Sequence, residues 1–224
     1  MHCIFGLTAK WLQNVSSYYS FSQLLLFLFQ VCRTAVMVVG ELFIHLKRNI
    51  EPELEKVMMP LILKSGDTNK FLREDCNVAL DAIVENSSPA KIILIVTAEA
   101  VYHKSPVVRT TVSRLLAYTV ERMGIAKALA GGKDMTEKLL PAVAKLAQDG
   151  SPDARNYSKS CLHRMIHEHP DFEKILKKSL TPNTMRNLEK ILEALKNPHA
   201  NHTNGFSSRG SRSRQRGNNR GKTL

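Results

Sequence analysis

Residues 105–124 read SPVVRTTVSRLLAYTVERMG, and residues 151–168 read SPDARNYSKSCLHRMIHE. Each stretch opens with serine and proline, which favour the N-cap and the first turn of a helix. Each also carries an arginine three residues after the proline. Two earlier segments align with them, and the four arginines are spaced by 40, 36 and 46 residues. The aligned residues are Arg33, Arg73, Arg109 and Arg155. This recurrence predicts an internal repeat.

Apolar residues recur at the same distances from each arginine. Positions −1, +3, +6, +7, +10 and +11 are apolar in most of the four segments. These offsets trace one face of an α-helix. Thr119 and Ser158 are polar exceptions on this face, and Gly40 offers little surface for packing. Each segment is therefore predicted to form a helix with one buried face.

A second amphipathic run precedes three of these helices and is joined to each by a short turn. The runs are residues 52–64, 89–102 and 135–147, and the turns are residues 65–69, 103–106 and 148–152. A single helix pair cannot bury its apolar face alone, but stacked pairs share a continuous core. The predicted fold class is all-α, an α-solenoid of HEAT-like helical pairs.

The two ends of this array differ. Residues 181–196 have an amphipathic pattern, and we predict a helix that closes the C-terminal end. The helix expected near residues 31–46 has no convincing first helix before it, so the array is expected to begin in mid-repeat. Residues 21–31 are apolar but too short to span a bilayer, and Arg33 follows at once. We interpret residues 1–30 as an atypical apolar segment without membrane attachment, with a weak membrane anchor as the alternative.

The formal net charge is +12, and half of it lies in the last 28 residues, which contain no acid. Residues 197–224 are mainly Gly, Ser, Asn and Arg, and they have too little apolar surface to offset the entropy of ordering. We predict a disordered tail after a solenoid over residues 31–196. Its basic residues are Arg209, Arg212, Arg214, Arg216, Arg220 and Lys222. Such an arm suits an anionic partner, and a purely solubilising role is the alternative.

The sequence contains no pattern typical of an enzyme or a cofactor site. The four cysteines form no CxxC pair, so no zinc knuckle is indicated. His163 and His167 have a spacing that can chelate a metal, but the HExxH pattern is absent. We interpret them as part of a solvated helix end. The sequence thus predicts a protein that is not an enzyme and has no metal or cofactor.

Two stretches resemble a known family. Residues 40–86, GELFIHLKRNIEPELEKVMMPLILKSGDTNKFLREDCNVALDAIVEN, and residues 105–124 are similar to the later part of a TOG domain, the tubulin-binding HEAT array of CLASP-type proteins. They look most like the TOG array regulators of axonemal microtubules, also called crescerins. The resemblance implies a flat paddle of six HEAT repeats. Residues 31–196 would correspond to repeats three to six, with the first two missing.

The resemblance also implies that tubulin binds along one edge, through the turns inside each repeat. The candidate tubulin-binding residues are Thr68, Asn69, Lys70, Lys104, Ser105 and Ser151. Basic and polar turn tips would suit the acidic surface of tubulin. The alternative is that these are solvated turn residues without a partner. The four aligned arginines are expected to be structural, each pairing with an acid or a carbonyl of a neighbouring repeat.

Together these features predict a non-catalytic module that binds tubulin or microtubules and contributes to the regulation of microtubule assembly. The expected location is the cytoplasm and the cytoskeleton, including the cilium or axoneme. Two other functions stay open. One is a general HEAT adaptor for another protein, and the other is RNA binding through the arginine-rich tail, which lacks the repeated aromatics typical of RNA-binding segments.

Overall fold

The computed structural model describes residues 21–130 and 132–196, and the regular structure of these residues is helical throughout. The elements in chain order are α2 (Phe21–Leu46), η1 (Lys47–Glu53), α3 (Leu54–Lys64), α4 (Lys70–Asn86), α5 (Pro89–Ala98), η2 (Ala100–Tyr102), α6 (Pro106–Met123), α7 (Ile125–Ala130), α8 (Lys133–Leu146), α9 (Pro152–Glu168), α10 (Phe172–Ser179) and α11 (Pro182–Lys196). The predicted disordered tail at residues 197–224 lies outside the described residues, as do residues 1–20.

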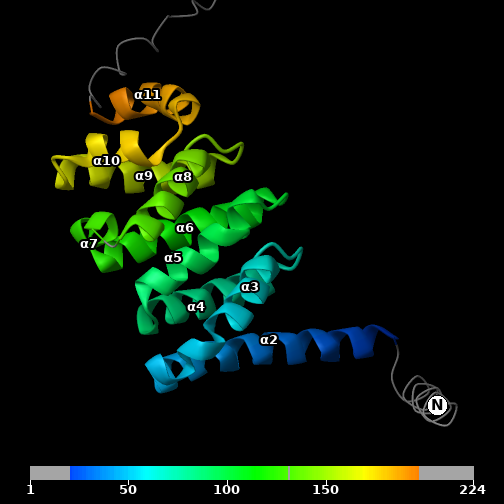
Figure 1. Ribbon diagram of the computed structural model, residues 1–224. Coiled ribbons are helices and arrows are strands. Elements are labelled where there is room, and N and C mark those ends of the chain that lie inside the picture. The colour runs from blue at the N-terminus through cyan, green and yellow to red at the C-terminus, as the bar shows by residue number, and fades with distance from the viewer. Residues whose placement is uncertain (1–20, 131, 197–224) are drawn as a thin grey trace, which may run out of the picture.

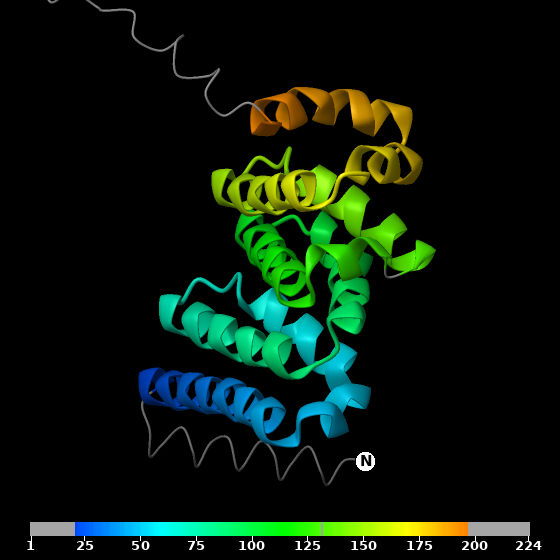
Figure 2. The same cartoon turned by 90° about the vertical axis from the view of Figure 1, so that its left-hand side faces the viewer.

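The helices stack as pairs in two layers (Figure 1). In Figure 2 the second helices α2, α4, α6 and α9 form one layer, and the first helices α3, α5 and α8 form the other. Within the layer of second helices, the most extensive packing joins α2 to α4 and α6 to α9. The prediction of an all-α solenoid of HEAT-like pairs is confirmed.

The polar exceptions on the predicted core face have hydrogen-bond partners inside the core. The Thr119 hydroxyl donates to the carbonyl oxygen of Leu115 at 2.7 Å. The Ser158 hydroxyl lies 2.7 Å from the Ser113 hydroxyl across the contact between α6 and α9. Both residues are almost fully buried. A hydroxyl is tolerated at these positions because its hydrogen bond offsets the cost of burial.

Gly40 lies where α2 approaches α4 most closely. A Cβ atom built at this position would lie 3.3 Å from the Cα atom of Ala79. The pairing of glycine with alanine lets the two backbones come together without a side chain between them. A residue that looked like a weak packer in the sequence therefore allows the close contact of α2 with α4.

Two elements differ from the sequence prediction. The second helix expected near residues 31–46 extends back at least to Phe21, the first described residue, because residues 24–29 are apolar and contain no cap residue that would start the helix after them. The C-terminal helix α11 follows a short helix, α10, which the sequence did not indicate, and both helices pack on α8 and α9. The eight residues of α10 are too few for a periodic pattern to stand out, yet Phe172 and Leu176 are fully buried.

Candidate functional site

The turns inside the three central pairs lie on one edge of the solenoid, at the right in Figure 1. We call this edge, made by residues 65–71, 102–107 and 145–153, the turn edge. Each turn leads into a second helix through an N-cap with extended backbone. The caps are Asn69, Ser105 and Ser151. Because proline or a cap side chain fixes each helix start, the three turns adopt one geometry.

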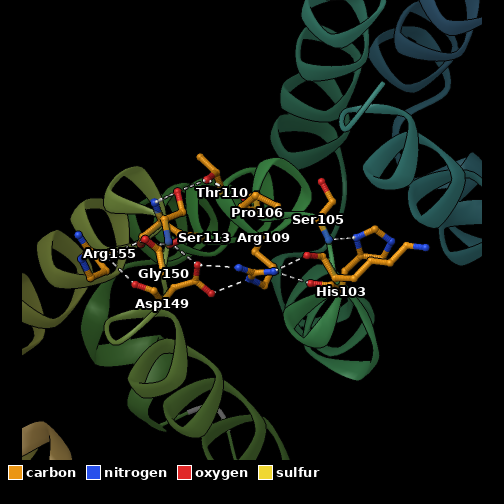
Figure 3. A network of polar contacts seen from close by, with 12 residues as sticks. His103, Ser105, Pro106, Arg109, Thr110, Ser113, Asp149, Gly150 and Arg155 are labelled. Atoms are coloured by element: carbon orange, nitrogen blue, oxygen red, sulfur yellow. Dashed lines mark hydrogen bonds and ion pairs between the residues drawn. The ribbon is translucent and has the colours of Figure 1, made fainter. Parts of the chain in front are cut away.

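The aligned arginines fasten each turn to its own second helix. In all three turns, Nη1 of the arginine donates to the carbonyl oxygens of the residues six and five positions earlier. Arg73 bonds to Asp67 and Thr68, both at 2.9 Å; Arg109 to His103 and Lys104 at 2.8 and 2.9 Å; Arg155 to Asp149 and Gly150 at 2.7 and 2.9 Å. The arginine thus supplies hydrogen bonds to turn carbonyls that have no partner within the helix. Figure 3 shows this arrangement for Arg109 and Arg155.

The residue six positions before each arginine also closes its turn with its side chain. In the first turn the Asn69 N–H donates to Asp67 Oδ1 at 2.9 Å. In the second the Ser105 N–H donates to His103 Nδ1 at 3.2 Å, and in the third the Ser151 N–H donates to Asp149 Oδ1 at 2.8 Å. An aspartate or a histidine can each accept this bond. The turn geometry therefore survives the change from aspartate to histidine in the middle repeat.

One arginine also links neighbouring repeats. The Arg109 guanidinium makes a two-pronged ion pair with Asp149, with Nε–Oδ2 and Nη2–Oδ1 distances of 2.6 and 3.0 Å (Figure 3). The side chains of Arg109 and Asp149 are only 18% and 6% exposed. The hydrogen bonds from Arg109 hold the pKa of the Asp149 carboxyl below its usual range. Arg109 therefore joins the turn of one pair to the turn of the next.

The expectation that each aligned arginine pairs with a neighbouring repeat is wrong for Arg73 and Arg155, whose hydrogen bonds go to carbonyl oxygens of their own turns. Arg33 on α2 forms a two-pronged ion pair with Asp75 on α4, including an Nη2–Oδ1 bond of 3.1 Å. Within the described part of the chain, Arg73 has no such acid across the repeat boundary. The position in the next turn that corresponds to Asp149 is held by His103. The link between the first two of the three turns therefore lacks an ion pair.

Lowering the pH is expected to destabilise the array through Asp149. Its folded-state pKa lies below the ordinary value because of the Arg109 hydrogen bonds. The ionised pair therefore contributes stability at neutral pH. This contribution is lost as the pH falls from the unfolded-state pKa, about 3.9, through the lower folded-state pKa. Urea unfolding at pH 7 and at stepwise lower pH measures the loss. Asp149→Asn should flatten the pH dependence, whereas Asp153→Asn, at an exposed position, should leave it unchanged.

The structure separates the predicted tubulin-binding residues into two groups. Asn69 and Ser151 are partly buried caps: Asn69 Oδ1 accepts from the Phe71 N–H at 2.9 Å, and the Ser151 hydroxyl lies 2.9 Å from that of Thr110. Ser105, the third cap, is also partly buried. The exposed group is Thr68, Lys70 and Lys104. Of the six predicted residues, these three have side chains that can reach a partner.

The turn edge also carries exposed apolar side chains that the sequence analysis missed. Phe71, Tyr102 and Val107 are 59%, 65% and 45% exposed. The ammonium of Lys145 lies 3.9 Å from the centre of the Tyr102 ring. Phe71 and Val107 each lie two residues before an aligned arginine, off the helical core face. That position relative to the arginine was the signal available in the sequence. The edge therefore combines positive charge with apolar surface.

The structure offers no support for a metal site. His163 and His167 lie on α9 with ring centres 4.3 Å apart. In residues 21–130 and 132–196 no three metal-binding side chains come together. Cys76 and Cys161 are buried free thiols, and burial raises the pKa of Cys161 to about 12. The two cysteines belong to the packing of the solenoid.

A sequence model of the CLASP N-terminal family matches residues 12–189. The chain belongs to this family. It is 38% identical over 167 residues to TOG array regulator of axonemal microtubules protein 1 of Mus musculus, covering 75% of this chain and 9% of that protein. It is 23% identical over 163 residues to Crescerin-like protein che-12 of Caenorhabditis elegans, covering 72% of this chain and 13% of that protein. The resemblance to TOG array regulators is confirmed.

Two solved structures share the fold. The MAST/Orbit N-terminal domain superposes with a TM-score of 0.54 at 18% identity, covering 75% of this chain and 74% of the other. A chain from the structure "TOG-tubulin binding specificity promotes microtubule dynamics and mitotic spindle formation" superposes with a TM-score of 0.52 at 17% identity, covering 73% and 61%. The mouse relative is named as a regulator of axonemal microtubules.

Proposed function

We propose that this CLASP-family chain is a non-catalytic tubulin-binding module that contacts tubulin through its turn edge. The observation that carries the proposal is the common geometry of the three turns, each fastened by an arginine to its own second helix. Rigid turns present Thr68, Lys70 and Lys104 without a further cost of ordering the backbone. Positive side chains in fixed positions attract an acidic protein surface and orient it during encounter.

The exposed apolar residues fit the same proposal. Phe71, Tyr102 and Val107 stand beside the lysines on the turn edge. Burial of aromatic side chains provides most of the binding energy in many protein interfaces, and a charged rim provides orientation. The mixed chemistry of the edge fits a folded acidic protein as the partner.

The proposed setting is the microtubule cytoskeleton of the cilium. The support is the match to proteins named as TOG array regulators of axonemal microtubules and as Crescerin-like. The chain spans about a tenth of the length of these curated relatives, so it corresponds to one module of a larger assembly of domains. We propose that such a module contributes tubulin contacts to the regulation of microtubule assembly.

The double substitution Lys70→Glu with Lys104→Glu is expected to weaken tubulin binding roughly tenfold or more, about 1.4 kcal/mol. Both ammonium groups are exposed, and Lys70 has only a loose 3.4 Å pair with Glu74. The fold should therefore be unaffected. Affinity for tubulin dimers, measured at two salt concentrations, checks the result, because the lysine contribution should shrink as salt rises.

The matched control is Lys127→Glu with Lys138→Glu, which makes the same change in net charge away from the turn edge. Lys127 lies on α7 and Lys138 on α8, and both are exposed. This variant should bind tubulin nearly as well as the unchanged chain. Equal losses in the two double variants would show that total charge, and not the turn edge, determines binding.

A further inference from the structure

The outer face of α2 carries a row of apolar side chains that nothing in the described chain covers. Its members alternate in steps of three and four residues: Leu28, Val31, Ala35, Val38 and Leu42. Leu28, Val31, Val38 and Leu42 are 55%, 50%, 50% and 41% exposed. Alternating steps of three and four keep a row on one side of a helix, as in helices that pack lengthwise together. We call these five residues the outer row.

The outer row is separate from the contact of α2 with the rest of the solenoid. Each of its members directly precedes a residue of the row that faces α4: Phe29, Cys32, Val36, Val39 and Phe43. One residue corresponds to about 100° around a helix. The outer row therefore lies to one side of the α4 contact, where a further helix can pack without displacing α4.

Residues 1–20 have the pattern of a helix that matches this row. Apolar side chains recur at steps of three and four at Ile4, Leu7, Trp11, Val15 and Tyr18, and Phe5, Leu12 and Tyr19 directly follow members of this row. The polar positions are Lys10, Gln13, Asn14, Ser16 and Ser17. No proline interrupts the segment. The pattern predicts one apolar face and one polar face.

A capping sequence lies between this segment and α2. Ser20 and Gln23 have the spacing of a capping box, in which a serine N-cap is followed three residues later by glutamine. Phe21 is the first residue of α2 that the structure describes. The capping box predicts that the chain does not continue as one straight helix before this point. We therefore expect the preceding residues to form a separate element, joined to α2 by a short turn.

We propose that residues 3–17 form a helix that folds back along α2 and packs on the outer row. Fifteen helical residues extend about 22 Å. A helix that starts back from the turn at residues 18–20 would therefore run beside α2 to about Val38, which covers most of the outer row. The polar face with Lys10 and Gln13 would point to solvent. This helix would act as the cap that the open end of a solenoid needs.

The position of the segment in the chain favours it over other occupants. Because it is tethered directly to Phe21, its effective concentration at the outer row exceeds that of a second copy in dilute solution. The other candidate is a lipid bilayer. By length and composition alone, Leu25–Lys64 contains a stretch apolar enough to cross a membrane, and 11% of that stretch is buried. The polar face of residues 1–20 favours a surface helix beside α2.

Trp11 is the only tryptophan of the chain, so its fluorescence tests the proposal directly. In the unchanged full chain we expect blue-shifted Trp11 emission and weak quenching by acrylamide, because the indole is packed on α2. Val31→Glu with Val38→Glu should shift the emission to the red and raise the quenching constant at least twofold. Both valines are half exposed in residues 21–196, so helix content by circular dichroism should stay unchanged.

Met37→Glu with Ile44→Glu is the matched control, since both residues are exposed but lie on the opposite side of α2. It should leave Trp11 shielded. The proposal is overturned if Trp11 is quenched as freely in the unchanged chain as in the valine variant. It is also overturned if shielding requires a dimer detected by light scattering, or appears only after addition of phosphatidylcholine vesicles. Tubulin affinity plays no part in this test, so it is independent of the proposed function.

Discussion

Arg109→Ala is expected to lower the free energy of unfolding by about 2 to 3 kcal/mol. This side chain makes four hydrogen bonds: two to the carbonyl oxygens of His103 and Lys104, and two to the carboxylate of Asp149. Its loss would leave Asp149, whose side chain is 6% exposed, without a counterion. The cost is large because a nearly buried carboxylate would lose its ion-pair partner and keep only the hydrogen bond from the Ser151 N–H.

Two variants separate the ion pair from the turn contact. Arg155→Ala removes only the bonds to the carbonyl oxygens of Asp149 and Gly150, so it should cost about 1 kcal/mol. Arg109→Lys keeps the charge but loses the two-pronged geometry, and it should fall between these values. Urea unfolding followed by circular dichroism measures all three. An Arg109→Ala variant no less stable than Arg155→Ala would contradict the role assigned to the link between repeats.

Phe43→Ala is expected to lower the free energy for local unfolding of α2 from the solenoid by about 3 to 4 kcal/mol. Phe43 is completely buried and belongs to the row of α2 that faces α4. Its truncation removes apolar contact area and leaves a cavity that two rigid helices cannot close. Because α2 is the first described helix of a stacked array, the loss should appear there before it spreads.

Hydrogen exchange of the α2 amides measures this effect, and α9 amides serve as the internal reference. Tyr102→Ala is the matched control, because Tyr102 lies on η2 away from α2, is 65% exposed, and its truncation leaves no cavity. It should change stability by less than about 0.5 kcal/mol. Equal protection of α2 in the Phe43→Ala variant and the unchanged chain would show that Arg33 and Gly40 hold this helix without the phenylalanine.

Most of the solenoid could be predicted because the same pattern of apolar residues recurs in each repeat. The apolar offsets from the arginines, together with Pro106 and Pro152, locate three helix pairs. The start of α2 could not be predicted in this way. In the other repeats a turn precedes the aligned arginine, and the second helix starts after that turn. In α2 the apolar residues 24–29 occupy the place of this turn. Continuation of the helix followed from the absence of a cap.

The candidate site was predicted only in outline. The turns and their arginines were found from periodicity, but the atoms they bind were not. Asp149 looked like an ordinary turn residue, yet it closes its own turn and pairs with Arg109 from forty residues earlier. Phe71 and Val107 were missed because only polar and basic turn residues were considered as binding candidates, although both residues lie off the core face of their helices.

The sequence by itself determined the helical period, the pairing of helices, the position of the turns and the all-α class, because these depend on residues near one another in the chain. Only the tertiary structure decided which lysines project freely, which acid pairs with which arginine, and which face of α2 lies open. Those properties depend on the distance between repeats. That distance is set by side-chain volumes on both sides of each contact, such as Gly40 against Ala79, and no single stretch of sequence contains both sides.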